Sequence, residues 1–413
     1  MSIDVATRSA LIRGVTAFAV VFAVGSAAVF AAGRIGQPEA APPSSTAVVT
    51  SAPPTPGTQT PEAWLAWVPG GLPDGLASEM TSIPVIADTT TATADVAWLT
   101  SSTNAHGTLV DAPNAPDMIP IDTTGVDPGF ATFLQPPERR LVADLRPGQG
   151  VLSESEAKLR GLDVGSTLTF STGKAVTIVG TLPDVLMGGY ELLVGRTTGV
   201  KIGVTHERYV LFNVKPSSHI TSGQLAQRLV PYLPFDAPYP VVEVRAPGET
   251  TYLRANDRAA PPIVLKERFG EFQGYPDPSS AKLVNIDRTW VEDHIASDTL
   301  PVLGTVSCNS VTLDLLRHAM NRMKADGNSG DVTGHGACYA PVLDPTDPDG
   351  PFTAAPFGAS IDINPGTNPP GTSPSQPPAL VGAMARWGFG WGGRDAYQQG
   401  ALFRYRAGTI ARD

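Results

Sequence analysis

The sequence is poor in charge and in the short motifs of common enzymes, and these shortages exclude several classes of function. Charged residues make up 16% of the 413 residues, and the formal net charge is -10. Nucleic-acid binding calls for clustered Lys and Arg, so we expect no nucleic-acid partner. The chain has no G-x-S-x-G, H-E-x-x-H, P-loop or C-x-x-C motif, and its six histidines form no close pair at helical metal spacing.

Apolar residues are abundant, so the chain is not disordered as a whole. They make up 42% of the sequence, and the length corresponds to two or three domains. Forty prolines and 42 glycines predict many turns and extended connections. We expect an α+β protein that is poor in helix.

One long uncharged run, Gly14 to Ala32, predicts a transmembrane helix. Its 19 residues span roughly 28 Å, enough to cross the hydrocarbon core. Arg8 and Arg13 precede the run and Arg34 follows it, which favours a cytoplasmic N-terminus. A cleaved signal peptide is the alternative, although its apolar region is ordinarily shorter. We therefore expect residues 1–36 to be a short cytoplasmic segment and a single-pass anchor in the cell membrane, with the bulk of the chain extracytoplasmic.

Residues 37–62 are rich in Pro, Ser, Thr and Ala and contain almost no large apolar side chain. Such a segment cannot bury enough surface to offset its ordering entropy, so we expect an extended linker. Folded sequence begins at Ala63, and we expect residues 63–240 to form a mixed α/β domain.

The clearest local pattern of this domain lies between Gly150 and Leu182. A strand at Val151-Leu152 is followed by Ser153 and Glu156, which form an S-x-x-E capping box. The box predicts a helix that ends at Gly161.

Two strands are predicted next, Thr167–Phe170 and Val176–Val179, joined by a turn at residues 171–173. The order of strand, helix, GLDVGSTLTF, turn and VTIVG resembles the extracytoplasmic domain of FtsX/MacB-type ABC transporter permeases. In that family an L-x-V-G-D-x-L motif opens a barrel-like sheet, and Ser166 here replaces its Asp. An ordinary small β domain remains the alternative. No transporter helices accompany the segment, so we do not expect this chain to transport by itself.

Residues 241–301 are predicted to be a connector. The stretches 252–254 and 266–272 mix aromatic and charged residues densely. They either pack their Phe side chains inward or form a contact surface for the last domain or a glycan.

Residues 302–413 form the predicted C-terminal domain. Apolar side chains at helical spacing predict a helix over Val311 to Lys324, ended by Asp326-Gly327. We expect His318, within this helix, to be a surface residue rather than a metal ligand.

The segments 357–365 (FGASIDINP) and 387–393 (WGFGWGG) resemble the D-alanyl-D-alanine carboxypeptidase (VanY-type) family of zinc peptidases. The family binds zinc with a His and an Asp in S-x-H-x-x-G-x-A-x-D and a second His in D-x-x-H-F. Alignment places Asp362 at the Asp, but Ala355 at the first His and Leu402 at the second.

Two further positions of the alignment also depart from the family. Gln399 lies close to the catalytic acid, and Val342 replaces an Arg that pairs with a substrate carboxylate. A catalytic zinc needs about three protein ligands, and alanine and leucine donate no lone pair. From the resemblance we therefore expect a carboxypeptidase-like fold that is inactive as an enzyme, with a vestigial Asp362, no catalytic residue and no cofactor.

The two cysteines fit the same resemblance. Residues 336–341 (GACYAP) resemble the family's G-x-C-Y-x-P-R segment, which implies a disulfide between Cys308 and Cys338. An isolated pair of cysteines outside the cytoplasm usually forms one bond.

Two metal sites remain as alternatives to an inert domain. His335 could join Asp362 and another carboxylate, and residues 344–350 (DPTDPDG) resemble a calcium loop faintly. Calcium wants six to eight oxygen ligands, and two prolines interrupt this spacing, so an acidic turn is the default.

We therefore expect a membrane-anchored envelope protein that binds peptidoglycan stem peptides, or an envelope protein partner, without catalysis. Alternatives are an active zinc D-Ala-D-Ala carboxypeptidase or endopeptidase with rearranged ligands, and an accessory subunit of an envelope ABC transporter. The candidate cleft consists of residues that the resemblance brings together: Tyr339, Asp362, Asn364, Trp387 and Trp391.

Overall fold

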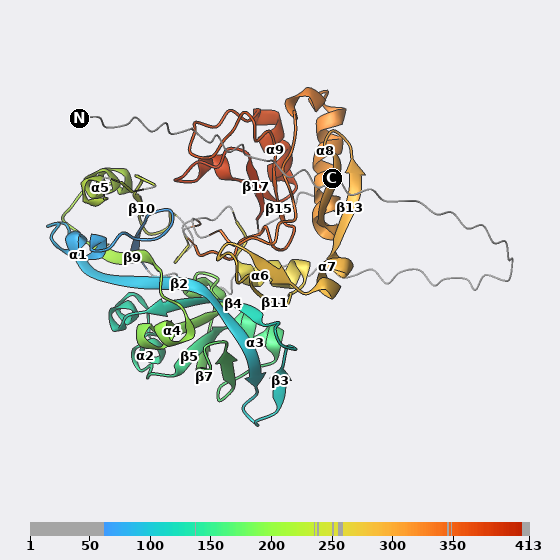
Figure 1. Cartoon of the computed structure of the whole chain (residues 1–413). Coiled ribbons are helices and arrows are strands. Elements are labelled where there is room, and N and C mark those ends of the chain that lie inside the picture. The colour runs from blue at the N-terminus through green and yellow to red at the C-terminus, as the bar shows by residue number, and fades with distance from the viewer. Residues whose placement is uncertain are drawn as a thin grey trace, which may run out of the picture. The chain divides into compact units, whose positions relative to one another are not determined.

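The computed structural model describes residues 62–406 apart from 137, 235, 238, 250–251, 255–258, 345–346 and 348. These residues belong to one compact unit and form a mixed α/β structure rich in sheet (Figure 1). In this part of the chain no helix is long and apolar enough to cross a membrane. The predicted membrane helix Gly14–Ala32 and nearly all of the predicted linker lie outside the described residues.

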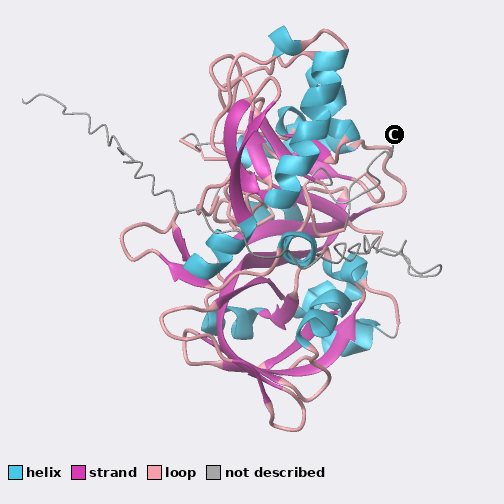
Figure 2. Ribbon diagram, turned by 90° about the vertical axis from the view of Figure 1, so that its right-hand side faces the viewer, coloured by secondary structure: helices cyan, strands magenta, loops and turns pink. Residues whose placement is uncertain are grey.

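The largest sheet of the described part has ten strands and closes partly into a barrel. Its central strand is β2 (Ile86–Thr103), which is 18 residues long. The first half of β2 pairs with β9, and its second half pairs with β4 and then with β6. Because β6 returns to β2, the strands β2, β4, β8, β5, β7 and β6 form a closed ring (Figure 2). The other strands of this sheet are β1 (Trp64–Trp67), β3 (Leu109–Asp111), β4 (Ile119–Val126), β5 (Gln149–Ser153), β6 (Thr167–Phe170), β7 (Ala175–Leu182), β8 (Leu192–Gly195), β9 (Glu207–Val214) and β10 (Glu243–Arg245).

Alternating burial along the barrel strands determines which side chains face the interior. Along β7 the side chains alternate between exposed or half-buried and buried, with Val176, Ile178 and Leu182 inside. Those three contribute to the cores of the barrel region, where strands β4 and β8 pair in parallel and β5 and β7 do the same.

The strands and the helix predicted for this region are confirmed, and the predicted capping box forms in half. The helix α3 (Glu154–Arg160) follows β5, and its cap Ser153 accepts a hydrogen bond through Oγ from the backbone N–H of Glu156 at 3.1 Å. It ends at Gly161, whose φ of 64° lies in the left-handed region. The return bond of the capping box is replaced, because the Glu156 carboxylate pairs with Arg160 instead.

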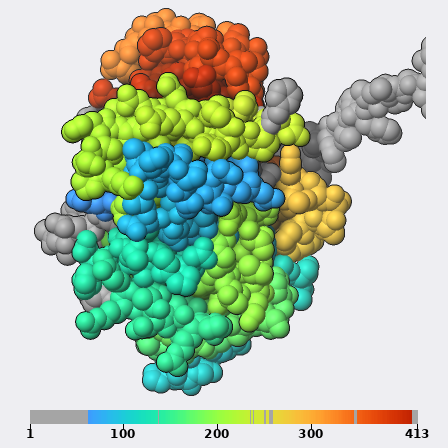
Figure 3. All heavy atoms as spheres, turned by 90° about the vertical axis from the view of Figure 1, so that its left-hand side faces the viewer, coloured from blue at the N-terminus to red at the C-terminus, as the bar shows by residue number. Residues whose placement is uncertain are grey.

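Short helices pack around this sheet. Figure 3 shows one face of the molecule, with the residues of the β1–β2 region in blue and those of the barrel region in teal and green. The helices of residues 62–249 beside α3 are α1 (Leu76–Thr81), α2 (Glu138–Ala143), α4 (Arg196–Ile202) and α5 (Ser222–Leu229).

The second half of the described chain contains the predicted long helix. It is α8 (Ser310–Ala325), which follows the hairpin of β13 (Ile295–Leu300) and β14 (Gly304–Asn309). The remaining elements of this half are α6 (Pro262–Phe269), β11 (Gly274–Pro276), β12 (Val284–Ile286), α7 (Arg288–His294), β15 (Ser360–Asp362), α9 (Pro378–Arg386), β16 (Phe389–Trp391) and β17 (Leu402–Tyr405).

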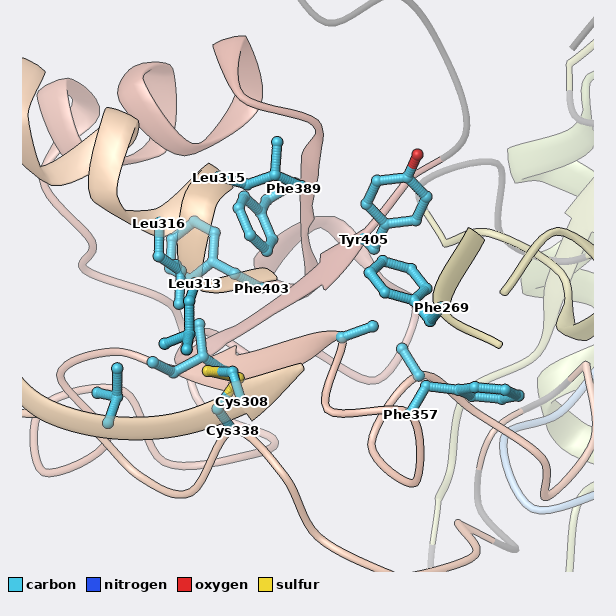
Figure 4. Close-up of a cluster of buried hydrophobic side chains, with 14 of the residues drawn as sticks. Phe269, Cys308, Leu313, Leu315, Leu316, Cys338, Phe357, Phe389, Phe403 and Tyr405 are labelled. Carbon is cyan, nitrogen blue, oxygen red and sulfur yellow. A yellow bond between two sulfur atoms is a disulfide. The ribbon is translucent and has the colours of Figure 1, made fainter. Parts of the chain in front are cut away.

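A single core joins these elements. Phe269 and Phe272, from the segment expected to be a connector, are buried in the same cluster as Phe357 and Phe403. Trp98 of β2 belongs to this cluster too, so the core reaches the large sheet. The predicted disulfide between Cys308 and Cys338 is present and lies within the same core (Figure 4).

Candidate functional site

Asp362 is the last residue of β15, and its cross-strand partner on β17 is Leu402. Directly opposed residues of an antiparallel pair lie on the same face of the sheet, so the leucine flanks the carboxylate. Asp362 is half-buried, and this burial raises the pKa of its carboxyl above the usual range. Among the described residues its carboxylate has neither a hydrogen bond nor an ion pair.

The other aligned positions serve the backbone of this region. The carbonyl of Ala355 accepts hydrogen bonds from the N–H groups of Ala340 and Gly358, at 3.2 and 3.0 Å. Val342 forms an isolated bridge with Leu283. These contacts connect loops and supply no metal ligand.

Trp391 lies on the opposite face of the small sheet from Asp362. The register aligns Ile361, Phe403 and Trp391 in one row, which is one residue out of phase with Asp362 and Leu402. The indole Nε1 of Trp391 donates to the carbonyl of Gly400 at 2.7 Å, which attaches the loop before β17.

Asn364 organises a turn. Its φ of 55° is left-handed, and its Oδ1 accepts from the N–H and Oγ1 of Thr333 at 2.7 and 3.0 Å. Its Nδ2 donates to the carbonyl of Asp331 at 2.8 Å and to Oε1 of Gln376 at 3.0 Å. The side chain thus uses its two amide hydrogens and both lone pairs inside the protein.

The last two candidate residues lie elsewhere in the domain. Trp387 follows α9 and stacks on His318 of α8, with ring centroids 4.3 Å apart and planes 14° apart. His318 is exposed, as the sequence predicted. Tyr339 is half-buried beside Cys338, and its N–H donates to Ser307. Within the described chain, none of the five candidate side chains is hydrogen-bonded to another.

A zinc ion does not fit the residues around Asp362. His335 forms a bridge with Ile363, and its Nδ1 contacts the carbonyl of Gly336 at 2.8 Å. No group of three or more His, Cys, Asp or Glu side chains is arranged to hold a metal in the described part of the chain. One carboxylate beside aliphatic neighbours is short of the three protein ligands that a catalytic zinc takes.

The acidic loop 344–350 is anchored by cationic and phenolic side chains. Asp347 is buried, and its Oδ2 lies 3.3 Å from Nη1 of Arg404. The carbonyl of Asp349 accepts from the Tyr190 hydroxyl at 2.9 Å, and the Tyr209 hydroxyl donates to its carboxylate. Burial and the neighbouring Asp349 raise the pKa of Asp347 to about 7, although Arg404 opposes the shift.

A network of buried charges continues from this loop, and sequence reasoning missed it. Asp122 of β4 pairs with Arg254 at 2.6 Å, and burial raises the pKa of its carboxyl to about 6 against the opposing Arg254. Lys266 of α6 pairs with Glu191 at 2.9 Å, and both side chains are fully buried. The available signal was a charge inside or directly after an apolar run, as for the Asp in IPIDTT and the Lys in PIVLKERF.

A hollow of about 460 Å³ lies on another part of the surface, next to α5. It contains no residue of the predicted site. Its lining consists of Val85, Ser218, His219, Ile220, Gln224, Gln227 and Arg228.

Comparisons with known proteins complete the description. The sequence matches no family model and no curated protein. The structure is similar to the periplasmic region of MacB from Actinobacillus actinomycetemcomitans, with 11% identity over 45% of this chain and 88% of that one, at a TM-score of 0.30. It is also similar to a domain of a putative permease from Porphyromonas gingivalis, with 16% identity over 45% and 88% of the two chains at a TM-score of 0.29. A third match is the extracellular domain of the noncanonic ABC-type transporter YknZ from Gram-positive bacteria. It is 12% identical over 44% of this chain and 98% of that one, at a TM-score of 0.29.

These three proteins are of the class that the sequence of the middle segment resembles. At such identities and TM-scores the likeness carries no argument about activity or partners.

Proposed function

We propose that the chain is a single-pass, membrane-anchored envelope protein whose C-terminal part binds cell-wall peptides without cleaving them. The observation that carries the proposal is the pairing of Asp362 with Leu402 across β15 and β17. The side chain of Leu402 contains only carbon and hydrogen, and it lies where the carboxypeptidase alignment requires a second metal ligand. The geometry therefore supports binding better than metal-assisted hydrolysis.

Asp362 gives such a binding surface a polar anchor. Its carboxylate is half-buried and has no partner among the described residues, so it is available to accept hydrogen bonds from a ligand. Peptide N–H groups and side-chain ammonium groups of stem peptides are donors of this kind. The disulfide between Cys308 and Cys338 supports an oxidising, extracytoplasmic setting for this part of the chain.

The test uses the full-length protein in detergent. Zinc content, cleavage of a D-Ala-D-Ala peptide and co-sedimentation with purified peptidoglycan are measured on the same sample. We expect binding without cleavage, and a roughly tenfold loss of affinity in Asp362→Asn if one charge-assisted hydrogen bond is removed. Exposed Asp293→Asn is the matched control.

Three results contradict the proposal. Stoichiometric zinc with cleavage favours the enzyme with rearranged ligands. Absence of co-sedimentation removes the wall ligand. Co-purification with an ABC permease in place of wall binding favours the accessory subunit.

A further inference from the structure

Six charged side chains, four buried and two half-buried, form a cluster where α6 meets the barrel. Two of them are cations, Arg160 and Lys266, and four are carboxylates that share these cations: Asp111, Glu156, Glu191 and Glu271. We call these six residues the α6 cluster. They come from β3, α3, the residue before β8, α6 and the residues after α6, so the cluster joins the barrel to the second half of the described chain.

Every side-chain nitrogen of the two cations already contacts an acceptor. Lys266 Nζ donates to Glu191 at 2.9 Å and to the carbonyl of Pro120 at 2.6 Å, and it lies 3.0 Å from Glu271. Arg160 directs Nε, Nη1 and Nη2 at three different carboxylates, those of Glu156, Asp111 and Glu271. With every member ionised, the α6 cluster has a net charge of -2 in a water-poor setting.

Two buried carboxylate oxygens are left without a partner. Glu191 Oε2 accepts from Lys266 and from the backbone N–H of Asp122 at 2.8 Å. Glu191 Oε1 and Glu156 Oε2 have no hydrogen-bond partner in the described part of the chain. A buried acceptor without a donor is costly, and a negative charge in excess of its counter-ions is more costly still.

We propose that Glu191 holds a proton and that this proton fastens α6 and the residues after it to the barrel. The proton reduces the net charge of the α6 cluster to -1 and converts one unpartnered oxygen into a hydroxyl. The groups that face Glu191 are Glu156 and Arg160 from α3, Lys266 from α6, Glu271 after α6, and Asp122 from β4 with its partner Arg254. Burial raises the pKa of Glu191 to about 8 despite the opposing charge of Lys266, in agreement with this geometry.

The consequence is an attachment that is tighter in acid. When α6 detaches, Glu191 becomes exposed and returns to an ordinary carboxyl pKa of roughly 4.3. The attached state therefore binds the proton more strongly, so its stability is complete below that value and is lost as the pH rises toward 8. Because Phe269 and Phe272 lie in the core of the second half, detachment of α6 loosens that half from the barrel.

Hydrogen exchange of the full-length protein between pH 5 and 9, corrected for intrinsic rates, tests the proposal. The measured ratio is the opening equilibrium constant of residues 262–269 in the wild type divided by the same constant in Glu191→Gln. The amide of this variant mimics the protonated acid. We expect this ratio to rise by up to roughly tenfold per pH unit up to about 8 and then to level off. Glu292→Gln, an exposed site paired with Arg288, is the matched control and should leave the profile of the wild type unchanged.

A ratio that does not depend on pH overturns the proposal, whatever its size. A ratio that follows sodium concentration rather than pH overturns it too, because a cation then occupies the place of the proton. If Glu191→Gln does not fold, the test uses the wild type alone. The corrected exchange rate of α6 must then increase faster with pH than that of α8, and equal pH profiles of the two helices refute the proposal.

Discussion

Removal of the disulfide should cost the protein several kcal/mol of unfolding free energy. The bond joins Cys308 and Cys338, which are 30 residues apart, and both are buried in the core of the second half. In the chain-entropy treatment, release of a closed loop of this length corresponds to about 3.6 kcal/mol at 25 °C. Replacement of both residues by Ala avoids buried free thiols and new polar groups.

Thermal unfolding of the oxidised wild type, the reduced wild type and the double variant measures this effect. At roughly 2–4 °C per kcal/mol for a unit of 150–250 residues, and less for a larger one, we expect Tm to fall by no more than roughly 7–15 °C. Reduction of the wild type and the double substitution should produce the same loss, since both release the same loop. Exchange of the amides of α8, which begins two residues after Cys308, should report the loss locally.

Either of two results refutes the reasoning. A loss below about 1 kcal/mol means that native packing already restrains the loop as the bond does. A double variant that is still destabilised by reductant shows that the reductant acts elsewhere.

Two other substitutions test single features of the fold. Asn364→Ala removes four hydrogen bonds and puts at a φ of 55° a residue that tolerates the left-handed region less well than Asn, so we expect a loss of about 2–4 kcal/mol in urea unfolding, and Asn364→Gly should recover part of it through the backbone alone. Equal losses in the two variants contradict the role of the backbone. Asp347 has a pKa raised to about 7, so its contribution to stability is complete in acid and is lost as the pH rises toward 7; urea midpoints of Asp347→Asn should lack this decline, and a parallel decline in both proteins contradicts it.

Local signals predicted the elements that short stretches of sequence determine. The S-x-x-E pattern at Ser153 specifies the start of α3, and Gly161 specifies its end. The apolar spacing in residues 311–324 predicts α8 to within a residue at each end. The alternating residues of β6 and β7 belong to the same class, because each pattern reports which face of its own element is buried.

The charged interior could not be predicted in the same way. Lys266 and Glu191 are 75 residues apart in the sequence, and each alone is an ordinary charge that is exposed in most proteins. Their burial is a consequence of packing between distant segments. The grouping of the candidate residues differs from the sequence prediction for a related reason. The motif alignment put Asp362 and Trp391 in one cleft, but the pairing register of β15, β17 and β16 places them on opposite faces of the small sheet.

The length of β2 limits how this protein can be divided. At roughly 3.3 Å per residue, its 18 residues extend for about 60 Å. The hydrogen bonds of its first half join it to β9 in the open layer, which consists of β9, β1 and β10 outside the closed ring. The hydrogen bonds of its last residues to β6 close the barrel. An isolated barrel would therefore retain half of this strand as an unpaired ribbon, and a barrel without that half would lose the backbone ladder that continues into the layer. Force applied to either region is carried along one uninterrupted polypeptide backbone into the other.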